Sequence, residues 1–471
     1  MKRILLILLA CLMILPVFVG CNTGTATPAD TTEANKSENV SESDEANTGD
    51  TPLTELTLID GKTVSYKIIR PELSQSYLLE AMTDFRNAVK AKYGVTFSPA
   101  DDFVKGLASD AAYETEELEI LIGATNRKES KEVLATLNRG EYKICVVGNK
   151  LVMIGYNDYL TSLAVKDFME NELAAASDEK FTIATSVSRL ETNGAETIGN
   201  TDATLRIMTF NVLGSGSEYL KRVPVILKTI ETHSPDVIGF QECNKDQHNN
   251  MLNQLKDYAI AYKTHKGSST VVYTPILYRK DKYNLLDAGA EWLDSRYTKT
   301  NTKSIGWAVL EDKKTGDKFA VINIHGSLWS NDYDLPDGKT HADMNALAAN
   351  VWKEDNIRQM YDRMQAILSQ YGDIAVLWTG DFNFNKDHAA YKKATEEYKM
   401  HEAEVTATDK KDAGLKTTHP VGQKNDPESG KSIDHIFGNS KVTFRLHQVC
   451  NEGDEINGSD HYAVFADVKF N

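Results

Sequence analysis

The sequence is poor in cysteine, and this bears on how the fold is stabilised. It contains five cysteines in 471 residues. Cys11 and Cys21 fall in the N-terminal segment, and Cys145, Cys243 and Cys450 are scattered over the rest of the chain. An odd number at irregular spacing excludes the disulfide framework that holds many small secreted domains together. The fold must therefore depend on hydrophobic cores, which 41% hydrophobic residues can supply.

Positive charge is also scarce. The chain has 52 Lys and Arg against 68 Asp and Glu, a formal net charge of -16. Proteins that grip long nucleic acid through released counterions rely on a basic surface, so the composition argues against that class. A local basic groove or a bound divalent cation is still compatible with recruiting a phosphate.

The N-terminus lacks an apolar run long enough to cross a membrane as an ordinary helix. Lys2 and Arg3 precede an uncharged run at residues 4–19, and this pattern predicts a signal peptide over residues 1–20. In "FVGC", Cys21 follows a glycine as in the lipobox of bacterial lipoproteins. This resemblance implies an acylated Cys21 that anchors the protein to the outer side of the cytoplasmic membrane, in the cell envelope. Plain secretion, with Cys21 an ordinary residue, is the alternative.

Residues 21–52 have no apolar periodicity and are rich in Thr, Ser, Asn and acidic residues, which predicts a disordered acidic tether. Residues 53–190 predict a small α+β accessory domain, with hairpins turning at Asp60-Gly61 and Gly148-Asn149. That segment contains no histidine and no cluster of ligand residues. A structural role is the simplest interpretation. Its order of elements is similar to accessory domains of alpha-glucuronidases, which would imply sugar binding.

Residues 203–471 carry apolar runs separated by helical patterns, and such runs need cover on both faces. They predict an α/β domain in which sheets pack together with helices outside. Six of these runs lead into or out of a residue able to bind a cation or move a proton. The segments are "IMTFNV", "DVIGFQE", "FAVINIH", "VLWTGDFN", "SIDHIF" and "GSDH".

This ordered set resembles the endonuclease/exonuclease/phosphatase superfamily, whose members include deoxyribonuclease I. The resemblance spans residues 205–470. It implies a four-layer α/β/β/α sandwich, preceded here by the accessory domain. It also implies a phosphoric ester hydrolase that uses a divalent metal.

A phosphoester repels nucleophiles, so its hydrolysis needs a hard cation, a base for water and donors for the developing charge. Glu242, Asn211 and Asp460 offer the oxygen ligands that Mg²⁺ prefers, with Mn²⁺ as a substitute. These three residues are the predicted metal site.

The resemblance also implies catalytic roles. Asp434 is expected to hold His461 in one tautomer. Asp381 and Asn383 are expected to orient the attacking water and the phosphate, and His325 to donate to the phosphoryl group or the leaving oxygen. Sequence leaves open whether Asp381 or the Asp434–His461 pair takes the proton of water.

Two further residues are candidates for contact with the substrate phosphate. Arg279 ends the run "ILYR", and its planar fork suits a phosphate, although a surface ion pair is as good an explanation. His419 in "TTHP" is similar to a family loop near the active site, and a turn histidine is the alternative. After "GDFN", the inositol phosphatases of the family continue with Tyr-Arg, whereas Phe384-Asn385 stands here and disfavours an inositol phosphate. An insert after His325 holds aromatic residues that we expect at the rim of the cleft: Trp329, Tyr333 and Trp352, together with His341.

The sequence thus predicts a membrane-anchored, metal-dependent phosphodiesterase, nuclease or phosphatase outside the cell. Nucleic acid, a nucleotide or a phospholipid headgroup would be its substrate, and no obligate protein partner is implied. The alternative is a catalytically decayed surface protein that binds a cell-wall or glycan ligand.

Overall fold

The computed structural model divides the chain into two units, Met1–Pro52 and Leu53–Asn471. The described residues all belong to the second unit: 53–108, 111–193, 203–214, 219–293, 303–327, 352–411, 417–420 and 430–471. The predicted signal peptide, Cys21 and the tether lie outside them. No helix in the described ranges is long and apolar enough to cross a membrane.

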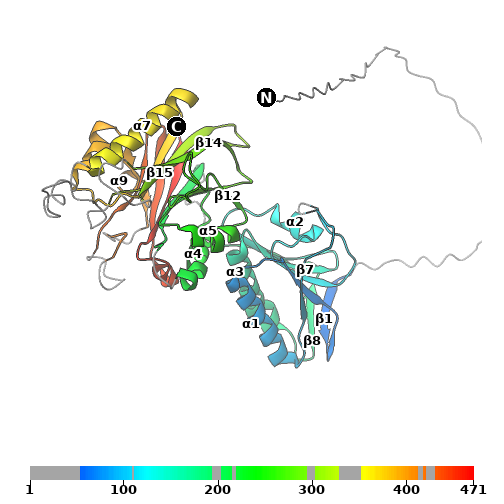
Figure 1. The fold of residues 1–471 in the computed structure, drawn as a ribbon. Helices are drawn as coiled ribbons and strands as arrows, with labels where there is room; N and C mark the ends of the chain where they lie inside the picture. The colour runs from blue at the N-terminus through cyan, green and yellow to red at the C-terminus, as the bar shows by residue number, and fades with distance from the viewer. Residues whose placement is uncertain are drawn as a thin grey trace, which may run out of the picture. The chain divides into compact units, whose positions relative to one another are not determined.

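The first part of this unit, residues 55–192, contains two sheets and the helices that cover them (Figure 1). The six-stranded sheet has the order β4-β3-β5-β7-β6-β9, with β3 (Lys67–Arg70), β4 (Ser98–Asp101), β5 (Glu119–Ile122), β6 (Glu141–Val147), β7 (Lys150–Gly155) and β9 (Ser188–Thr192). The three-stranded sheet has the order β2-β1-β8, with β1 (Glu55–Asp60), β2 (Thr63–Val64) and β8 (Lys180–Ala184). The helices are α1 (Ser76–Tyr93), α2 (Lys128–Leu134) and α3 (Asp158–Phe168), which continues as a π-helical turn (Met169–Leu173).

Both predicted hairpins occur in this part. β6 and β7 pair antiparallel around Gly148, whose φ of 60° suits glycine in a tight turn. β1 and β2 pair around Gly61, but over two residue pairs only. The following residues of the predicted first hairpin form β3, which pairs in parallel with β4 and β5. This part is therefore a separate α+β assembly, as the alternating patterns indicated.

The second part, residues 205–470, is built on two larger sheets. The seven-stranded sheet has the order β12-β13-β11-β10-β22-β21-β19, with β10 (Leu205–Asn211), β11 (Val237–Gln241), β12 (Tyr258–Ile260), β13 (Ile276–Arg279), β19 (Asp409–Lys410), β21 (Val442–Cys450) and β22 (Ala463–Phe470). The six-stranded sheet has the order β14-β15-β16-β17-β20-β18, with β14 (Tyr283–Trp292), β15 (Ser304–Asp312), β16 (Lys318–His325), β17 (Ala375–Asp381), β18 (His401–Glu402) and β20 (Asp434–Gly438).

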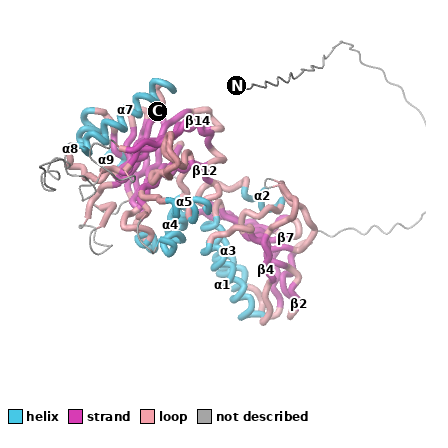
Figure 2. Tube along the Cα trace, in the orientation of Figure 1, coloured by secondary structure: helices cyan, strands magenta, loops and turns pink. Residues whose placement is uncertain are grey.

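Helices lie outside these sheets (Figure 2). They are α4 (Tyr219–His233), α5 (Lys245–Asn250), α7 (Lys353–Tyr371), α8 (Ala389–Lys392) and α9 (Ala403–Thr406), with 3₁₀ turns at Leu252–Gln254 and Gly453–Asn457 and a π-helical turn at Lys393–Glu397.

Alternation along the strands explains the layers. In β10, Ile207 belongs to the core between the sheets, and Met208 belongs to the core under α4. In β17, Leu377 faces the same inter-sheet core, and Trp378 packs in the core under α7. Because successive side chains point to opposite faces, a strand buried on both faces is apolar throughout. The arrangement is the four-layer α/β/β/α sandwich, and the predicted fold class is confirmed.

A polar layer interrupts the inter-sheet core near one end. Gln241 Nε2 donates to Asn323 Oδ1 at 2.7 Å, and Thr379 Oγ1 donates to the same oxygen at 3.1 Å. Gly239 lies over this layer, and a Cβ there would come within 2.5 Å of Thr379 Oγ1. Buried polar groups joined across two sheets fix their relative register. This layer lies directly beneath the strand ends that carry the chemistry.

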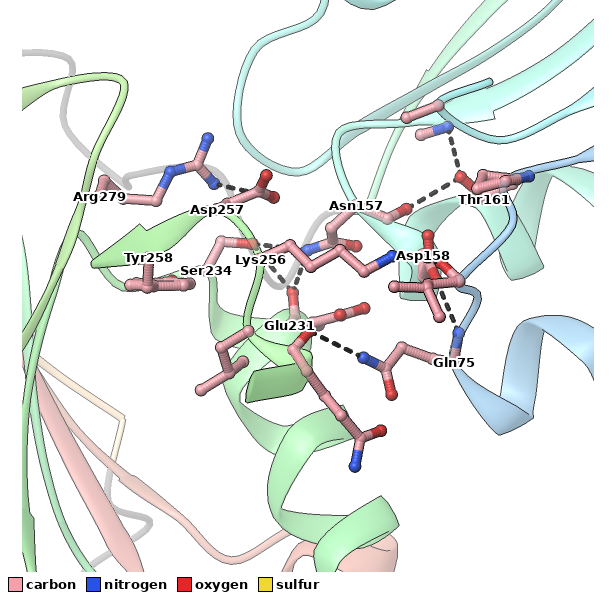
Figure 3. A pocket seen from close by; sticks show the side chains of 16 residues that line it. Gln75, Asn157, Asp158, Thr161, Glu231, Ser234, Lys256, Asp257, Tyr258 and Arg279 are labelled. Carbon is pink, nitrogen blue, oxygen red and sulfur yellow. Dashed lines mark hydrogen bonds and ion pairs between the residues drawn. The ribbon is translucent and has the colours of Figure 1, made fainter. Parts of the chain in front are cut away.

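Residues of the two parts meet around a cavity of about 230 Å³, whose lining Figure 3 shows. Glu231 on α4 is half-buried there, and it accepts hydrogen bonds from the Tyr77 hydroxyl and from the Tyr159 backbone N–H, the latter at 3.0 Å. Burial, with the nearby Asp158 carboxylate, raises the pKa of Glu231 to about 8. Lys256 reaches toward Asp158 in the same cavity (Figure 3).

Replacing Glu231 with glutamine is expected to change how stability depends on pH. A raised carboxyl pKa means that the folded state binds the proton more tightly than the unfolded state does. The contribution of this group to stability is therefore fully present below pH 4.5 and is lost as the pH rises through about 8. Glutamine cannot ionise. The free energy of unfolding of Glu231→Gln, relative to that of the natural protein, should therefore rise by at least about 1.4 kcal/mol from pH 5 to pH 9, the equivalent of one pKa unit. Urea unfolding at both pH values measures this, with the exposed Glu80→Gln on α1 as control. Parallel pH profiles for Glu231→Gln and the natural protein would contradict the assignment.

Candidate active site

The predicted catalytic residues lie side by side where the strands of the six-stranded sheet end. β16 and β17 run parallel, so that His325 pairs with Asp381. β20 runs antiparallel to β17, so that its first residue, Asp434, is the next neighbour of Asp381. Strand direction and register thus place three groups from distant parts of the sequence in one row.

The seven-stranded sheet brings its own residues to the same end of the sandwich. Asn211 ends β10, and Glu242 directly follows β11, which is parallel to β10. The Asn211 Nδ2 group donates to Glu242 Oε1 at 3.2 Å and to Asp381 Oδ2 at 3.0 Å. One carboxamide therefore ties the carboxylates of the two sheets together.

Two of these residues adopt left-handed backbone conformations. Glu242 has a φ of 56° and Asn383 a φ of 58°. Such values are uncommon for residues with side chains and occur often at functional sites. The glycine of "GDFN", Gly380, cannot be replaced by a residue with a side chain without a clash, because a Cβ there would lie 2.2 Å from the Ile324 backbone oxygen. The turn after β17 is therefore built to set the direction of Asp381 and Asn383.

Asp434 and His461 form the predicted pair. His461 Nδ1 lies 2.9 Å from Asp434 Oδ2, and Thr418 Oγ1 donates to the same oxygen at 2.6 Å. Burial disfavours the charged imidazole, but Asp434, followed by Asp381, outweighs it and raises the pKa of His461 to about 10. The other ring nitrogen, Nε2, lies 3.8 Å from Asp381 Oδ2.

His325 is electrostatically different from His461. It is buried, and its Nε2 lies 3.5 Å from Asp381 Oδ2, 3.7 Å from Glu242 Oε1 and 2.5 Å from Lys303 Nζ. Burial, together with the ammonium of Lys303, lowers the pKa of His325 to about 4. At neutral pH this ring is uncharged and accepts a hydrogen bond from Lys303.

Asp381 remains a carboxylate at the centre of this group. Although burial opposes its charge, the neighbouring His461, His325 and Lys303 lower its pKa below the ordinary value. Its Oδ1 accepts from the Asn383 backbone N–H at 2.9 Å, and the Asn383 side chain donates to the Gly326 carbonyl at 3.0 Å.

Glu242, Asn211 and Asp460 are all found at this end of the sandwich. The Glu242 side chain is 30% exposed. Asp460 follows Ser459, whose hydroxyl donates to the Asn211 backbone carbonyl at 2.6 Å. The side chains of Glu242, Asn211 and Asp460 offer carboxylate and amide oxygens, which are the ligands that a hard divalent cation prefers. The residues present therefore fit such an ion.

His419 joins the site from the segment before β20. Its Nε2 lies 3.7 Å from Asp460 Oδ2, and its ring centroid is 4.5 Å from that of His461. His419, Asp460 and His461 offer atoms within 4.8 Å of one another.

Arg279 does not belong to the site, so the prediction of a phosphate contact was wrong. β13 runs antiparallel to β11, and the Arg279 backbone N–H donates to the Asp236 carbonyl at the start of β11. Arg279 thus lies at the opposite end of the sheet from Glu242. There it pairs with Asp281 at 2.8 Å and covers the ring of Tyr156. Arg279 forms an ion pair, as the alternative stated, but its own side chain is 10% exposed and does not lie on the surface.

Three of the expected rim residues, Trp329, Tyr333 and His341, lie outside the described residues. Trp352 is 3% exposed and packs at the start of α7 instead of standing at a rim.

Sequence reasoning missed two lysines at the site. Lys303 lies just before β15, opposite the end of β16, and contacts His325. Lys353 begins α7 and donates to the Asn383 backbone carbonyl. Neither belongs to a recognisable motif, and only their burial, with 7% and 8% exposed, marks them as unusual.

With this geometry established, comparison with known proteins defines the class. The endonuclease/exonuclease/phosphatase family model matches residues 208–461, more than half of the chain. The chain belongs to this family, whose members hydrolyse phosphoesters. No curated protein sequence matches it.

Several solved structures are similar in fold. An endonuclease/exonuclease/phosphatase from Bacteroides vulgatus is 23% identical, with a TM-score of 0.45 over 57% of this chain and 99% of that chain. A mannosyl-6-phosphatase from Bacteroides thetaiotaomicron is 19% identical, with a TM-score of 0.47 over 57% and 100%. TDP2 from D. rerio, solved with a single-strand DNA product, is 17% identical, with a TM-score of 0.42 over 56% and 98%.

Proposed function

We propose that this protein is a membrane-anchored, extracellular phosphoesterase that requires Mg²⁺ or Mn²⁺ and uses water as the nucleophile. The observation that carries this proposal is the Asn211 carboxamide, which joins Glu242 of one sheet to Asp381 of the other. Around this link stand His325 and the Asp434–His461 pair. Acceptors for water and donors for a phosphoryl group are thus collected at one point.

Asp381 and His461 are the groups that handle the attacking water. Their facing atoms, Oδ2 and Nε2, are 3.8 Å apart, so a water beside them lies within hydrogen-bond reach of both. Asp434 fixes the His461 ring through Nδ1 and leaves Nε2 for the reaction. Asp381 accepts the proton that the water loses when its oxygen bonds to phosphorus, because His461, with a pKa of about 10, already carries its proton at neutral pH and donates from Nε2.

Lys303 supplies hydrogen-bond donors on the other side of Asp381, and the uncharged His325 ring accepts one of them at Nε2. Lys303 carries the positive charge of this pair, because the His325 pKa is about 4. Fixed donors of this kind stabilise the negative charge that develops on phosphoryl oxygens.

Glu242, Asn211 and Asp460 would hold the divalent ion. Bound there, it would offset phosphate charge and polarise the ester. Glu242→Gln should raise the metal concentration for half-maximal activity about tenfold or more, because it removes a charged oxygen ligand. A Mg²⁺ titration of hydrolysis measures this, with Glu80→Gln on α1 as control. Equal metal requirements in both variants would remove Glu242 from the metal site.

The anchor and location rest on the N-terminal sequence. An acylated Cys21 after a cleaved signal peptide, followed by a polar tether, would hold the enzyme outside the cytoplasmic membrane. Metabolic labelling with a fatty acid, compared between the natural protein and Cys21→Ser, tests this. Equal label in both would leave plain secretion as the explanation.

The proposed substrates are nucleic acid, a nucleotide or a phospholipid headgroup. The test is a panel of the purified full-length chain against linear DNA, RNA, nucleotides, sphingomyelin and inositol phosphates, with Mg²⁺, with Mn²⁺ and with EDTA. We expect hydrolysis of at least one phosphoester with metal and none with EDTA. No hydrolysis of any substrate, combined with binding to a glycan array, would instead support the decayed surface protein.

A further inference from the structure

A small hollow of about 150 Å³ opens beside the active site, and we call it the lysine hollow. Its polar lining residues are Lys353, Asn383, Asn385, Asp387, His388 and Lys431. Asn383 belongs to both places, since its backbone N–H donates to the Asp381 carboxylate. A group held in the hollow would therefore lie next to the site where the ester is cleaved.

The hollow gathers positive charge. Lys353 is 8% exposed, and Lys431 stands at the rim. Burial, with repulsion from Lys431 and Lys303 outweighing attraction to Asp381, lowers the pKa of Lys353 to about 8. Two positive charges held close together repel each other, and an anion that binds between them reduces this repulsion.

Two of the other polar groups, His388 and Asn385, carry hydrogen-bond donors. His388 Nδ1 accepts from the Ala390 backbone N–H at 3.0 Å, so the ring proton resides on Nε2. This buried Nε2–H has no acceptor among the described residues. Asn385 Oδ1 accepts from the Ser432 backbone N–H at 3.1 Å, so the amide N–H groups are the donors that its side chain offers. Asp387 is the one carboxylate among the described lining residues, and it is exposed.

A buried donor without an acceptor is costly, and a buried lysine next to a second lysine is costly as well. An anionic ligand in the hollow removes the second of these costs, because it offsets the charges of Lys353 and Lys431, which both line the hollow. We propose that the lysine hollow binds a second phosphate group of the substrate, beside the phosphoester under attack. This proposal rests on the proposed function, because the second group must belong to the molecule that is hydrolysed.

Direct binding tests the hollow without turnover. Calorimetric titration of the full-length chain with sodium sulfate, in EDTA, should show binding that weakens about fivefold or more in Lys353→Gln and in Lys431→Gln. Lys392→Gln, on the exposed side of α8, is the matched control and should bind as the natural protein does. Lys431 is exposed, so its variant tests the proposal even if Lys353→Gln fails to fold. No binding by the natural protein, or equal binding by all variants, would overturn the proposal.

Kinetics then connect the hollow to the substrate. The matched pair is thymidine 5′-(p-nitrophenyl phosphate) with and without a 3′-phosphate, followed by release of p-nitrophenol. Lys431→Gln should raise KM for the 3′-phosphorylated ester about fivefold, with kcat and the KM of the other ester nearly unchanged. Equal changes for both esters would overturn the proposal. If neither ester nor any compound of the panel is hydrolysed, the proposed function fails, and the sulfate titration alone decides whether the hollow is an anion site.

Discussion

Replacing Asp381 with asparagine is expected to lower kcat/KM for phosphoester hydrolysis about a thousandfold or more, with the fold unchanged. Asp381 lies within 4 Å of His325 and His461 and accepts from the Asn211 side chain. Asparagine has almost the same shape but can neither accept the proton of water nor balance the charge of His461. The loss should appear in kcat, because the carboxylate acts on the reacting groups.

A matched control lies just before the same strand. Asp373 precedes β17 at its other end, and its side chain is 75% exposed beside Lys441. Asp373→Asn should leave kcat/KM within about twofold, because an exposed ion pair contributes little. Circular dichroism and urea unfolding would establish that both variants fold. A folded Asp381→Asn variant with near-normal activity would remove Asp381 from the mechanism.

Replacing Asp467 with alanine is expected to destabilise the protein by about 3–5 kcal/mol. Asp467 on β22 and Arg206 on β10 form a bidentate pair, with N–O distances of 2.7 and 2.9 Å, and both side chains are almost fully buried. Arg206 also donates to the His233 carbonyl at 2.9 Å and covers the ring of Phe465. Alanine would leave a buried guanidinium without its carboxylate, and this costs far more than the loss of one contact.

The contrast with an exposed pair makes this prediction specific. Lys228 and Asp454 lie 3.3 Å apart with side chains 40% and 69% exposed. Asp454→Ala should cost less than about 1 kcal/mol. Urea unfolding of both variants at pH 7 gives the two differences in free energy, and equal costs would show that burial does not decide the strength of the Arg206 pair.

The sequence was sufficient to predict the sandwich and the residues at its strand ends. "IMTFNV" and "VLWTGDFN" are apolar at consecutive positions, as strands covered on both faces must be, and each ends in a polar residue. The groups come together because the parallel pairs β10–β11 and β16–β17 end at the same side, and β20 and β22 begin there.

Strand direction explains what the sequence could not reveal. Arg279 ends an apolar run just as Asp381 does, but β13 is antiparallel to its neighbour, and a run of apolar residues carries no direction. The hairpin predicted from Asp60-Gly61 has the same limitation, because the pattern did not indicate that β3 would leave it for a parallel sheet.

Lys303 and Lys353 were missed for another reason. A lysine at the start of a strand or helix is usually a solvated charge, and nothing in the neighbouring residues distinguishes these two. Their role arises from tertiary packing that buries them against His325 and Asn383. The tie between Asn211 and both carboxylates is likewise a property of two sheets meeting, which no local pattern encodes.

The central claim is that water attacks phosphorus at the site formed by Asn211, Glu242, Asp381 and His461. Hydrolysis of the best substrate of the panel in ¹⁸O-labelled water, with Mg²⁺, tests it most directly. The account predicts that one solvent oxygen appears on the phosphorus of the product, and that this incorporation falls at least about a thousandfold in Asp381→Asn. Solvent oxygen found in the released alcohol and not in the phosphate product, or undiminished incorporation by the folded variant, would contradict it.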